Sequence, residues 1–302
     1  MKPTVITLLL ATFLFSCEKD LTVDFPFEGE RLLIYSEFEN GEIFRVKVDK
    51  TYPPTGEILF EKTFLDSVEV HIYEDGVFLE NLTHASPLSH LFYSKDNNRA
   101  RLGHSYQVRA RSSQIPEVSS TPEILLPTVE IDSIWLTEGN YFSPNNPLKE
   151  AYLVNVSLKN IPAQVPYLYF EMRGFIDETE ANTQFISLDE LGELESPCTF
   201  GGSIDRYFKV SCFNDEESIF RFYVEKEGIY GSPPNLVINS VNEIEFEISS
   251  VNKSYFDYNY LQNNGLSFFS IFEGVNPTYS TFDNGYGAIL TKNKTSKKLK
   301  LD

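Results

Sequence analysis

The chain has 302 residues, a length that accommodates two domains of ordinary size. Its 44 acidic and 25 basic residues give a formal net charge of -19, which would repel nucleic acid and anionic lipid headgroups. This charge excludes nucleic acid as a partner. Aromatic residues make up 14% of the chain, and Phe and Tyr far outnumber the one Trp, a composition that favours β-strands.

The chain begins with the layout of a secretory leader. Lys2 is followed by an apolar segment from Val5 to Phe15 and then by the small residue Ser16. The apolar segment is too short to span a bilayer, which needs about 20 such residues. We therefore expect residues 1–16 to be a signal peptide.

The residues Leu14 to Cys17 resemble the lipobox of bacterial lipoproteins, in which a dedicated peptidase cuts before the cysteine and the new terminal cysteine is acylated. Several acyl chains on Cys17 would hold the protein durably at a lipid bilayer, whereas a single chain binds only marginally. An ordinary leader with a chance cysteine is the alternative. Residues 17–28 lack periodicity and contain Pro26, so they predict a lipidated tether.

The three residues after Cys17 carry a second signal. Glu18, Lys19 and Asp20 resemble the export signal that lipoproteins of the Bacteroidota use to reach the cell exterior. The expected location is therefore the outer membrane, with the protein lipid-anchored and facing outward.

Acylation of Cys17 would leave two further cysteines, Cys198 and Cys212. An even pair in an oxidising compartment predicts a disulfide bond. By chain entropy, closing this short loop would stabilise the fold by about 3 kcal/mol. Two free buried thiols are the alternative.

Alternation of apolar and polar residues predicts an N-terminal β-sandwich over residues 29–120. In "DSVEVHIYEDG" the residues Val68, Val70 and Ile72 point one way, and Asp75-Gly76 predicts a hairpin turn. In "GHSYQVRA" the inner face is formed by the residues Tyr106, Val108 and Ala110. Both strands are typical of an antiparallel sheet with one solvent-exposed face.

A proline-rich and serine-rich stretch near residues 116–128 predicts the junction to a second, β-rich domain over residues 121–291. Alternation resumes there, most clearly in "NEIEFEISS". One short helix is expected near residues 250–263, with Ser250 as its N-cap and its aromatic side packed on a sheet. The last segment, residues 292–302, is rich in lysine and predicts a mobile tail. The expected fold is therefore mostly β, with two antiparallel sandwich-like domains.

These features occur in an order that resembles a known family. The lipobox, the module "DSVEVHIYEDG" with "GHSYQVRA", the junction running into "IDSI" and the ending "NPTYSTFDNGYGAIL" are together similar to outer-membrane lipoproteins of the Bacteroidota described as a domain of unknown function. The resemblance covers nearly the whole mature chain, and it implies a neighbouring TonB-dependent receptor as partner. The first module also resembles the carboxypeptidase-regulatory, transthyretin-like β-sandwich. The lysine-rich ending departs from the family pattern.

No catalytic residue, metal site or cofactor is assigned from the sequence. The four histidines, His71, His84, His90 and His104, lack the metalloprotease spacing and are interpreted as surface residues. The 44 acidic residues make any acid pair unspecific, and no acidic segment was found with the spaced Asp-x-Asp-x-Asp-Gly pattern of calcium loops.

One loop is a candidate for contact with a partner or ligand. "GNYFSPNNP" places Tyr141 and Phe142 among Gly, Asn, Ser and Pro, where exposed rings point to binding. The alternative is that both rings fold back onto the sandwich. The resulting hypothesis is a non-catalytic accessory or ligand-capturing subunit of a TonB-dependent uptake system. A surface hydrolase and an adhesive surface protein are the alternatives.

Overall fold

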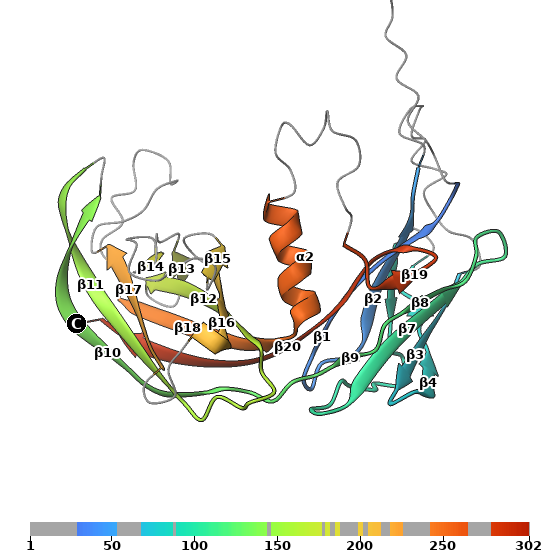
Figure 1. Ribbon diagram of the computed structural model, residues 1–302, viewed down its shortest axis with the longest axis horizontal. Coiled ribbons are helices and arrows are strands. Elements are labelled where there is room, and N and C mark those ends of the chain that lie inside the picture. Colours follow the sequence, from blue (N-terminus) through green and yellow to red (C-terminus); the bar gives the residue numbers. More distant parts are fainter. Residues whose placement is uncertain are drawn as a thin grey trace, which may run out of the picture.

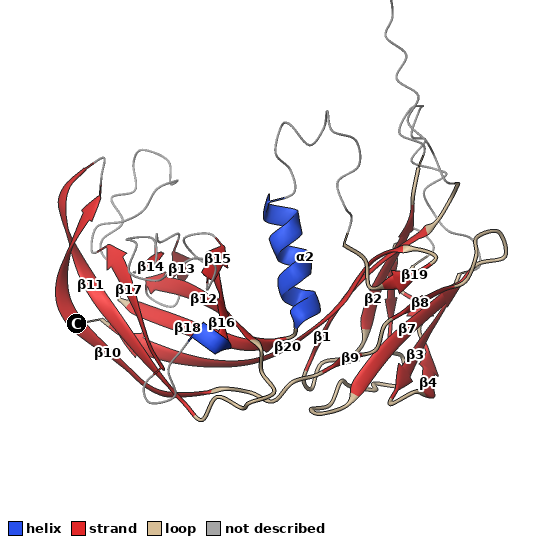
Figure 2. Ribbon diagram, viewed as in Figure 1, coloured by secondary structure: helices blue, strands red, loops and turns tan. Residues whose placement is uncertain are grey.

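The computed structural model describes residues 29–52, 68–86, 89–143, 146–176, 179–181, 185–187, 199–201, 205–212, 218–225, 242–264 and 279–301. These residues form three sheets and one α-helix, α2 (Lys253–Asn264), as Figure 2 shows. The prediction of a mostly β, sandwich-like fold with one short helix is confirmed. Figure 1 shows a curved body in which a long sheet connects two sandwich-like ends, and α2 stands on the concave side of that sheet.

The N-terminal module packs two sheets face to face around one core. One sheet contributes the strands β1 (Leu32–Glu39), β2 (Arg45–Lys50), β5 (Thr83–His84) and β6 (Leu91–Tyr93). The other sheet consists of the strands β3 (Glu69–Glu74), β4 (Val77–Asn81), β7 (Ser105–Arg111), β8 (Val118–Ser120), β9 (Glu123–Ile124) and β19 (Phe282–Asp283).

Alternation decides which side chains enter this core. The inward residues of β3 and β7 are fully buried, as their pattern predicts: Val70, Ile72, Tyr106, Val108 and Ala110. Asp75 and Gly76 join β3 to β4, with φ angles of 51° and 79°. Positive φ at both positions is what a two-residue hairpin turn of this kind requires, so the predicted turn is confirmed.

The C-terminal module packs a four-stranded sheet against the other part of the long sheet. The four strands are β10 (Glu130–Ser143), β11 (Asn146–Lys159), β17 (Ser218–Glu225) and β14 (Phe185–Ser187). The long sheet contributes β12 (Tyr167–Ile176), β13 (Thr179–Ala181), β15 (Thr199–Gly201), β16 (Asp205–Lys209), β18 (Glu243–Val251) and β20 (Tyr286–Lys300). Phe170 is central to this core, with ring centroids 4.5 Å from Phe220, 4.8 Å from Phe208 and 5.2 Å from Phe246.

β20 is the strand that connects the two modules. Its first half pairs in parallel with β1, and its second half pairs antiparallel with β18. The ten-stranded sheet therefore continues from one module into the other. At Gly287, φ is 113° and an added Cβ would lie 1.8 Å from the carbonyl oxygen of Ile34. Only glycine permits this close approach of β20 to β1.

The expectation that residues 292–302 form a mobile tail is wrong, because residues up to Lys300 are the second half of β20. On one face of the strand, lysines pair with glutamates at Nζ–Oε1 distances of 2.6 to 3.0 Å: Lys292 with Glu37, Lys294 with Glu39 and Lys298 with Glu243. On the other face, Leu299 packs against the C-terminal core. Lys292, Lys294 and Lys298 are therefore partners of glutamates on neighbouring strands, and Lys294 and Lys298 remain partly exposed.

The boundary between the two cores lies inside the predicted junction. Leu125 belongs to the N-terminal core and Leu126 to the C-terminal core. The expected domains, residues 29–120 and 121–291, differ from the structure near the end of the chain. Phe282 and Ile289 were assigned to the second domain but pack in the N-terminal core. The last strand thus returns to complete the first module.

The helix begins later than expected. Asn252 caps it, because the Asn252 Oδ1 accepts a hydrogen bond of 2.9 Å from the backbone N–H of Tyr255. The predicted cap, Ser250, is instead a buried residue of β18, which continues to Val251. No helix among the described residues is long and apolar enough to cross a membrane.

Candidate functional site

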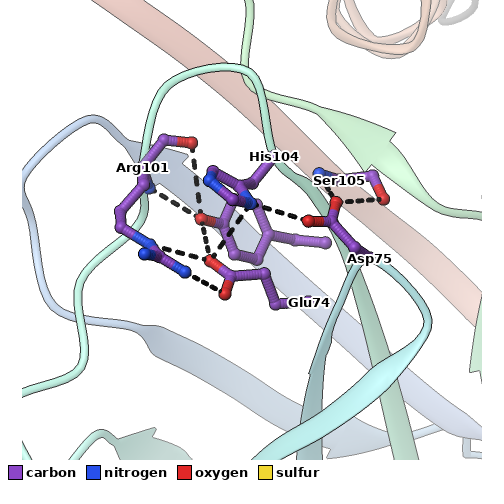
Figure 3. Close-up of polar contacts among 6 residues, drawn as sticks. Glu74, Asp75, Arg101, His104 and Ser105 are labelled. Atoms are coloured by element: carbon purple, nitrogen blue, oxygen red, sulfur yellow. Dashed lines mark hydrogen bonds and ion pairs between the residues drawn. The ribbon is translucent and has the colours of Figure 1, made fainter.

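The first candidate is a polar cluster beside the β3–β4 hairpin, drawn in Figure 3. The turn residue Asp75 accepts hydrogen bonds at Oδ1 from the backbone N–H of Ser105, at 2.9 Å, and from its hydroxyl, at 3.2 Å. The Asp75 Oδ2 lies 2.7 Å from Nδ1 of His104. The N–H of Ser105, followed by His104, lowers the pKa of Asp75 below its ordinary value.

A buried tyrosine completes this cluster. The hydroxyl of Tyr106 donates to Oε1 of Glu74 at 2.8 Å and accepts from the backbone N–H of Arg101 at 2.7 Å. The guanidinium of Arg101 pairs with the same carboxylate, with its Nε 3.2 Å from Oε1. Partial burial opposes ionisation of Glu74, but the bonds from Arg101 and Tyr106 outweigh burial and lower its pKa. The pKa of the Tyr106 hydroxyl is raised instead, because the side chain is buried.

The cluster contains Ser, His and Asp but lacks the connectivity of a catalytic triad. In a triad the histidine lies between nucleophile and carboxylate and takes the proton of the serine. Here the hydroxyl of Ser105 donates to Asp75, and so does the neighbouring His104 in the tautomer with a proton on Nδ1. With the backbone N–H of Ser105, the carboxylate therefore receives three donors, and the histidine does not act as a base toward the serine. The arrangement fastens the loop before β7 to the hairpin turn.

The second candidate is the face of the ten-stranded sheet that carries α2, called here the helix face. Its inner part contains three tyrosines, of which Tyr207 and Tyr255 are buried and Tyr169 is partly buried. The ring centroid of Tyr255 in α2 lies 6.0 Å from that of Tyr169 and 6.1 Å from that of Tyr207, and the latter two are 4.8 Å apart. Phe256 stacks on Tyr167 with centroids 4.2 Å apart. The expected packing of the aromatic side of the helix on a sheet is confirmed.

The aromatic part of the helix face extends outward to β1. Tyr258 of α2 lies 5.7 Å from Tyr35 between ring centroids, and Tyr35 is 36% exposed. The hydroxyl of Tyr255 donates to Oε2 of Glu37 at 3.1 Å, and Lys292 pairs with the other oxygen of that carboxylate. Burial, followed by the charge of Glu37, raises the pKa of Tyr35 to about 12 and raises the pKa of Tyr255 as well.

A row of charged side chains continues the helix face away from the helix. Glu247 of β18 has a side chain that is only 7% exposed, and its Oε2 lies 3.0 Å from Nη2 of Arg173 and 4.0 Å from Nζ of Lys294. Burial raises the pKa of Glu247, while the two cations oppose this effect. Lys294 also binds Glu39 across the sheet. Tyrosines and paired charges together form a surface that can stack on rings and exchange hydrogen bonds.

The residues singled out from the sequence lie elsewhere. Tyr141 and Phe142 were expected in a loop, but both belong to the end of strand β10, where Tyr141 is paired with Lys149 of β11. The expectation of a loop is therefore corrected, because the two strands of this hairpin extend to Ser143 and Asn146.

The cysteine predictions are tested only in part. Cys212 lies in a short 3-10 turn, Val210–Cys212, and is disulfide-bonded. Cys198, its predicted partner, and Cys17, the predicted lipidation site, lie outside the described residues. The pairing and the lipidation therefore stay predictions.

The histidines do not assemble into a site. His104 belongs to the hairpin cluster, whereas His71 lies 3.5 Å from Glu69 and His90 lies 3.7 Å from Asp49. In the part of the chain that the structure describes, no group of three or more His, Cys, Asp or Glu residues is placed to hold a metal ion.

The fold and the helix face define a class of protein: a double β-sandwich with a continuous sheet and an aromatic, ion-paired concave face. The chain belongs to the family described as "Domain of unknown function (DUF4249)", whose sequence profile matches residues 18–298. The match begins at the residue after Cys17. No curated protein matches the chain.

Proposed function

We propose that this protein is a lipid-anchored surface protein of the outer membrane and a non-catalytic accessory or ligand-capturing subunit of a TonB-dependent uptake system. The observation that carries the proposal is the lipobox-like ending of the leader at Cys17, directly ahead of the family domain. Several acyl chains on Cys17 would anchor the protein durably. The resemblance of the chain to Bacteroidota lipoproteins supports the TonB-dependent receptor as partner.

The attachment point of the tether supports a role beside a membrane protein. The tether leads into β1, which is hydrogen-bonded to β2 on one side and β20 on the other. An anchor on this strand would hold both modules near the outer leaflet. A neighbouring barrel would then meet the protein at high effective concentration, so even a weak interface would be occupied.

The helix face supports capture of a ligand. It combines the partly exposed Tyr35, its neighbour Tyr258, and carboxylates and ammonium groups already held in place by ion pairs. Rings and fixed polar groups on one concave surface are typical of binding sites. The ends of β10 and β11, with Tyr141 and Phe142, are the proposed contact with the transporter.

Purification from mildly solubilised outer membranes tests the proposal. An affinity tag is joined through a flexible linker after Asp302, because Leu301 is buried. A TonB-dependent barrel should co-purify in near-stoichiometric amount. Tyr141→Ala with Phe142→Ala should weaken this association without lowering the melting temperature, whereas the control Phe78→Ala, an exposed ring on another sheet, should leave it unchanged.

Recovery of the protein alone, across several detergents and growth conditions, would contradict the transport role. Hydrolysis of a glycan or peptide by the purified protein, lost on substitution of one Asp or Glu, would favour the hydrolase. Binding to host matrix without a transporter would favour the adhesive protein. An intact mass without acyl chains on Cys17 would contradict the lipid anchor.

A further inference from the structure

The outward face of the six-stranded sheet carries an arginine whose guanidinium is held in place by its neighbours. Arg109 of β7 donates hydrogen bonds from Nε and Nη2 to the Oε1 of Gln107, at 3.3 and 3.1 Å. Gln107 is fixed in turn, since its Nε2 donates to the Ser119 hydroxyl at 3.1 Å and to the Ser120 carbonyl oxygen at 2.7 Å. The central carbon of the guanidinium lies 4.3 Å from the ring centroid of Tyr73. The guanidinium is therefore oriented before any ligand is present.

Arg109 is an exception in an acidic chain, because no carboxylate of the described residues forms an ion pair with it. The nearby Glu69 is already engaged, with its Oε2 2.6 Å from Nη2 of Arg111 and 3.5 Å from Nε2 of His71. Gln107 takes the Nε–Nη2 edge of the Arg109 guanidinium. The opposite edge, where Nη1 and Nη2 present two parallel N–H groups, has no acceptor in the described part of the chain. Such an edge matches the two oxygens of a carboxylate.

Aromatic rings adjoin this guanidinium. The ring of Tyr73 contacts that of Phe78 on β4, with centroids 5.8 Å apart, and Phe78 lies at the same centroid distance of 5.8 Å from His71. His71 is directly opposite Arg109 in the pairing of β3 with β7. We call these four side chains the Arg109 patch. Phe78 is 52% exposed, so the patch offers an accessible ring beside the oriented N–H donors.

We propose that the Arg109 patch binds an organic carboxylate that is attached to an aromatic ring. The carboxylate would accept both N–H groups of the guanidinium edge, and little side-chain freedom is lost because that group is already oriented. The ring of the ligand would pack on Phe78. One singly charged carboxylate matches one unpaired arginine, whereas a phosphate ester carries more charge and Arg111 is already paired with Glu69. The site goes beyond the proposed transport role and does not depend on it.

Four variants separate the parts of this site. Arg109→Gln removes the guanidinium, and Arg109→Lys keeps the charge but loses the planar pair of donors. Arg111→Gln is the matched control, because it removes the same charge two residues further along the same strand. Phe78→Ala removes the exposed ring. The patch lies on a different sheet from the proposed transporter contact, so Phe78→Ala should change ligand binding and not the association with the barrel.

Ligand-observed NMR titration of the purified protein with phenylacetate tests the proposal. The parent should show saturable binding, and neutral phenylacetamide should bind at least about tenfold more weakly, because the charge-assisted hydrogen bonds are lost. Arg109→Gln should weaken phenylacetate binding by a similar factor, and Arg109→Lys should not restore it. Arg111→Gln should weaken it by less than about threefold, since that charge acts only from the neighbourhood. Phe78→Ala should reduce the preference for phenylacetate over acetate.

Absence of saturable phenylacetate binding by the parent would overturn the proposal. A loss in Arg109→Gln no larger than that in Arg111→Gln would overturn it too, because the anion would then respond to net charge and not to the oriented guanidinium. Equal binding of phenylacetamide and phenylacetate would exclude recognition of the carboxylate. Phenyl phosphate that binds more tightly than phenylacetate, and loses its binding in Arg109→Gln, would contradict the carboxylate and assign the patch to phosphate esters.

Discussion

The two modules build similar sandwiches in different ways. Apart from the shared β20, the N-terminal module has strands of at most eight residues, and polar side chains such as Glu74, Arg101 and Tyr106 fasten its loops. The C-terminal module has a hairpin of two 14-residue strands and a core with a cluster of phenylalanine rings. Both depend on the last strand, since β20 supplies Ile289 to one core and packs Leu299 on the other. Neither core is complete until the end of the chain is in place.

Among the changes proposed, deletion of residues 292–302 should give the largest difference in stability between the two modules. It removes the strand that pairs with β18 and the side chains of Leu299 and Leu301, so we expect a loss of about 5 kcal/mol or more in the free energy of unfolding. The parallel pairing of β1 with residues up to Thr291 would remain. Urea unfolding followed by circular dichroism measures the loss. Lys294→Gln with Lys298→Gln, which keeps the strand, should cost only about 1 kcal/mol. Unchanged melting after the deletion would mean that the segment is a tail.

Gly287→Ala should break the contact between β20 and β1. The added Cβ would meet the Ile34 carbonyl oxygen at 1.8 Å, so one strand must move, and we expect a loss of more than about 3 kcal/mol. The matched control is Gly41→Ala, which also has positive φ but has no atom within 4 Å of the added Cβ. It should cost only about 1 kcal/mol through backbone strain. Equal losses in the two variants would contradict the close approach.

Tyr106→Phe tests the hydrogen bonds that hold the loops of the N-terminal module together. The variant keeps the buried ring but leaves Glu74 and the backbone N–H of Arg101 without their shared hydroxyl, so we expect a loss of about 1–2 kcal/mol. Tyr73→Phe is the control, because the ring contacts of Tyr73 with Phe78 and Arg109 survive the change. Chemical denaturation of both variants measures the difference. A loss in Tyr73→Phe as large as in Tyr106→Phe would contradict a specific role of the hydroxyl.

Glu123 gives a smaller, pH-dependent effect at the junction between the modules. It accepts hydrogen bonds from Asn252 and Ser254 of the helix start, yet burial raises its pKa above 4.5. A raised pKa means that the folded state binds the proton more tightly. The contribution of Glu123 to stability is therefore complete below pH 4.5 and declines as the pH rises through the folded pKa.

Melting temperatures between pH 4 and pH 8 check this prediction. Glu123→Gln cannot titrate, so its decline with rising pH should be shallower than that of the parent. Glu80 and Glu247 also have raised pKa values and contribute to the decline in both proteins, which makes the difference between them the relevant quantity. The exposed control Glu117→Gln should follow the parent. Identical slopes for Glu123→Gln and the parent would refute the role of burial.

Alternation in the sequence was sufficient to predict the strands whose faces differ in polarity. Val70 and Ile72 of β3 are buried as predicted, and so are Ile244, Phe246 and Ile248 of β18. The prediction failed for β20, because five lysines in the last twelve residues suggested a mobile tail. The glutamates that pair with these lysines lie on β1 and β18, far away in the sequence, and only the folded sheet brings them together.

The site was less accessible to sequence analysis than the fold. The helix was expected to pack by its aromatic side, but nothing local to it indicates that Tyr255 would meet Glu37 of β1. His104 was interpreted as a surface residue because the histidines lack metal-ligand spacing, and nothing local to it indicates its hydrogen bond to Asp75 of a distant turn. The Asp75-Gly76 pair was the one local signal, since a hairpin turn leaves its aspartate free to bind neighbouring loops.

The central claim is that β20 makes the two modules one cooperative unit, and scanning calorimetry tests it most directly. Phe44→Leu alters only the N-terminal core and Phe170→Leu only the C-terminal core. Each should cost about 1 kcal/mol. We predict a single unfolding transition for the parent and for both variants, shifted as a whole to lower temperature by either change. Two transitions, one moved only by Phe44→Leu and the other only by Phe170→Leu, would contradict the claim.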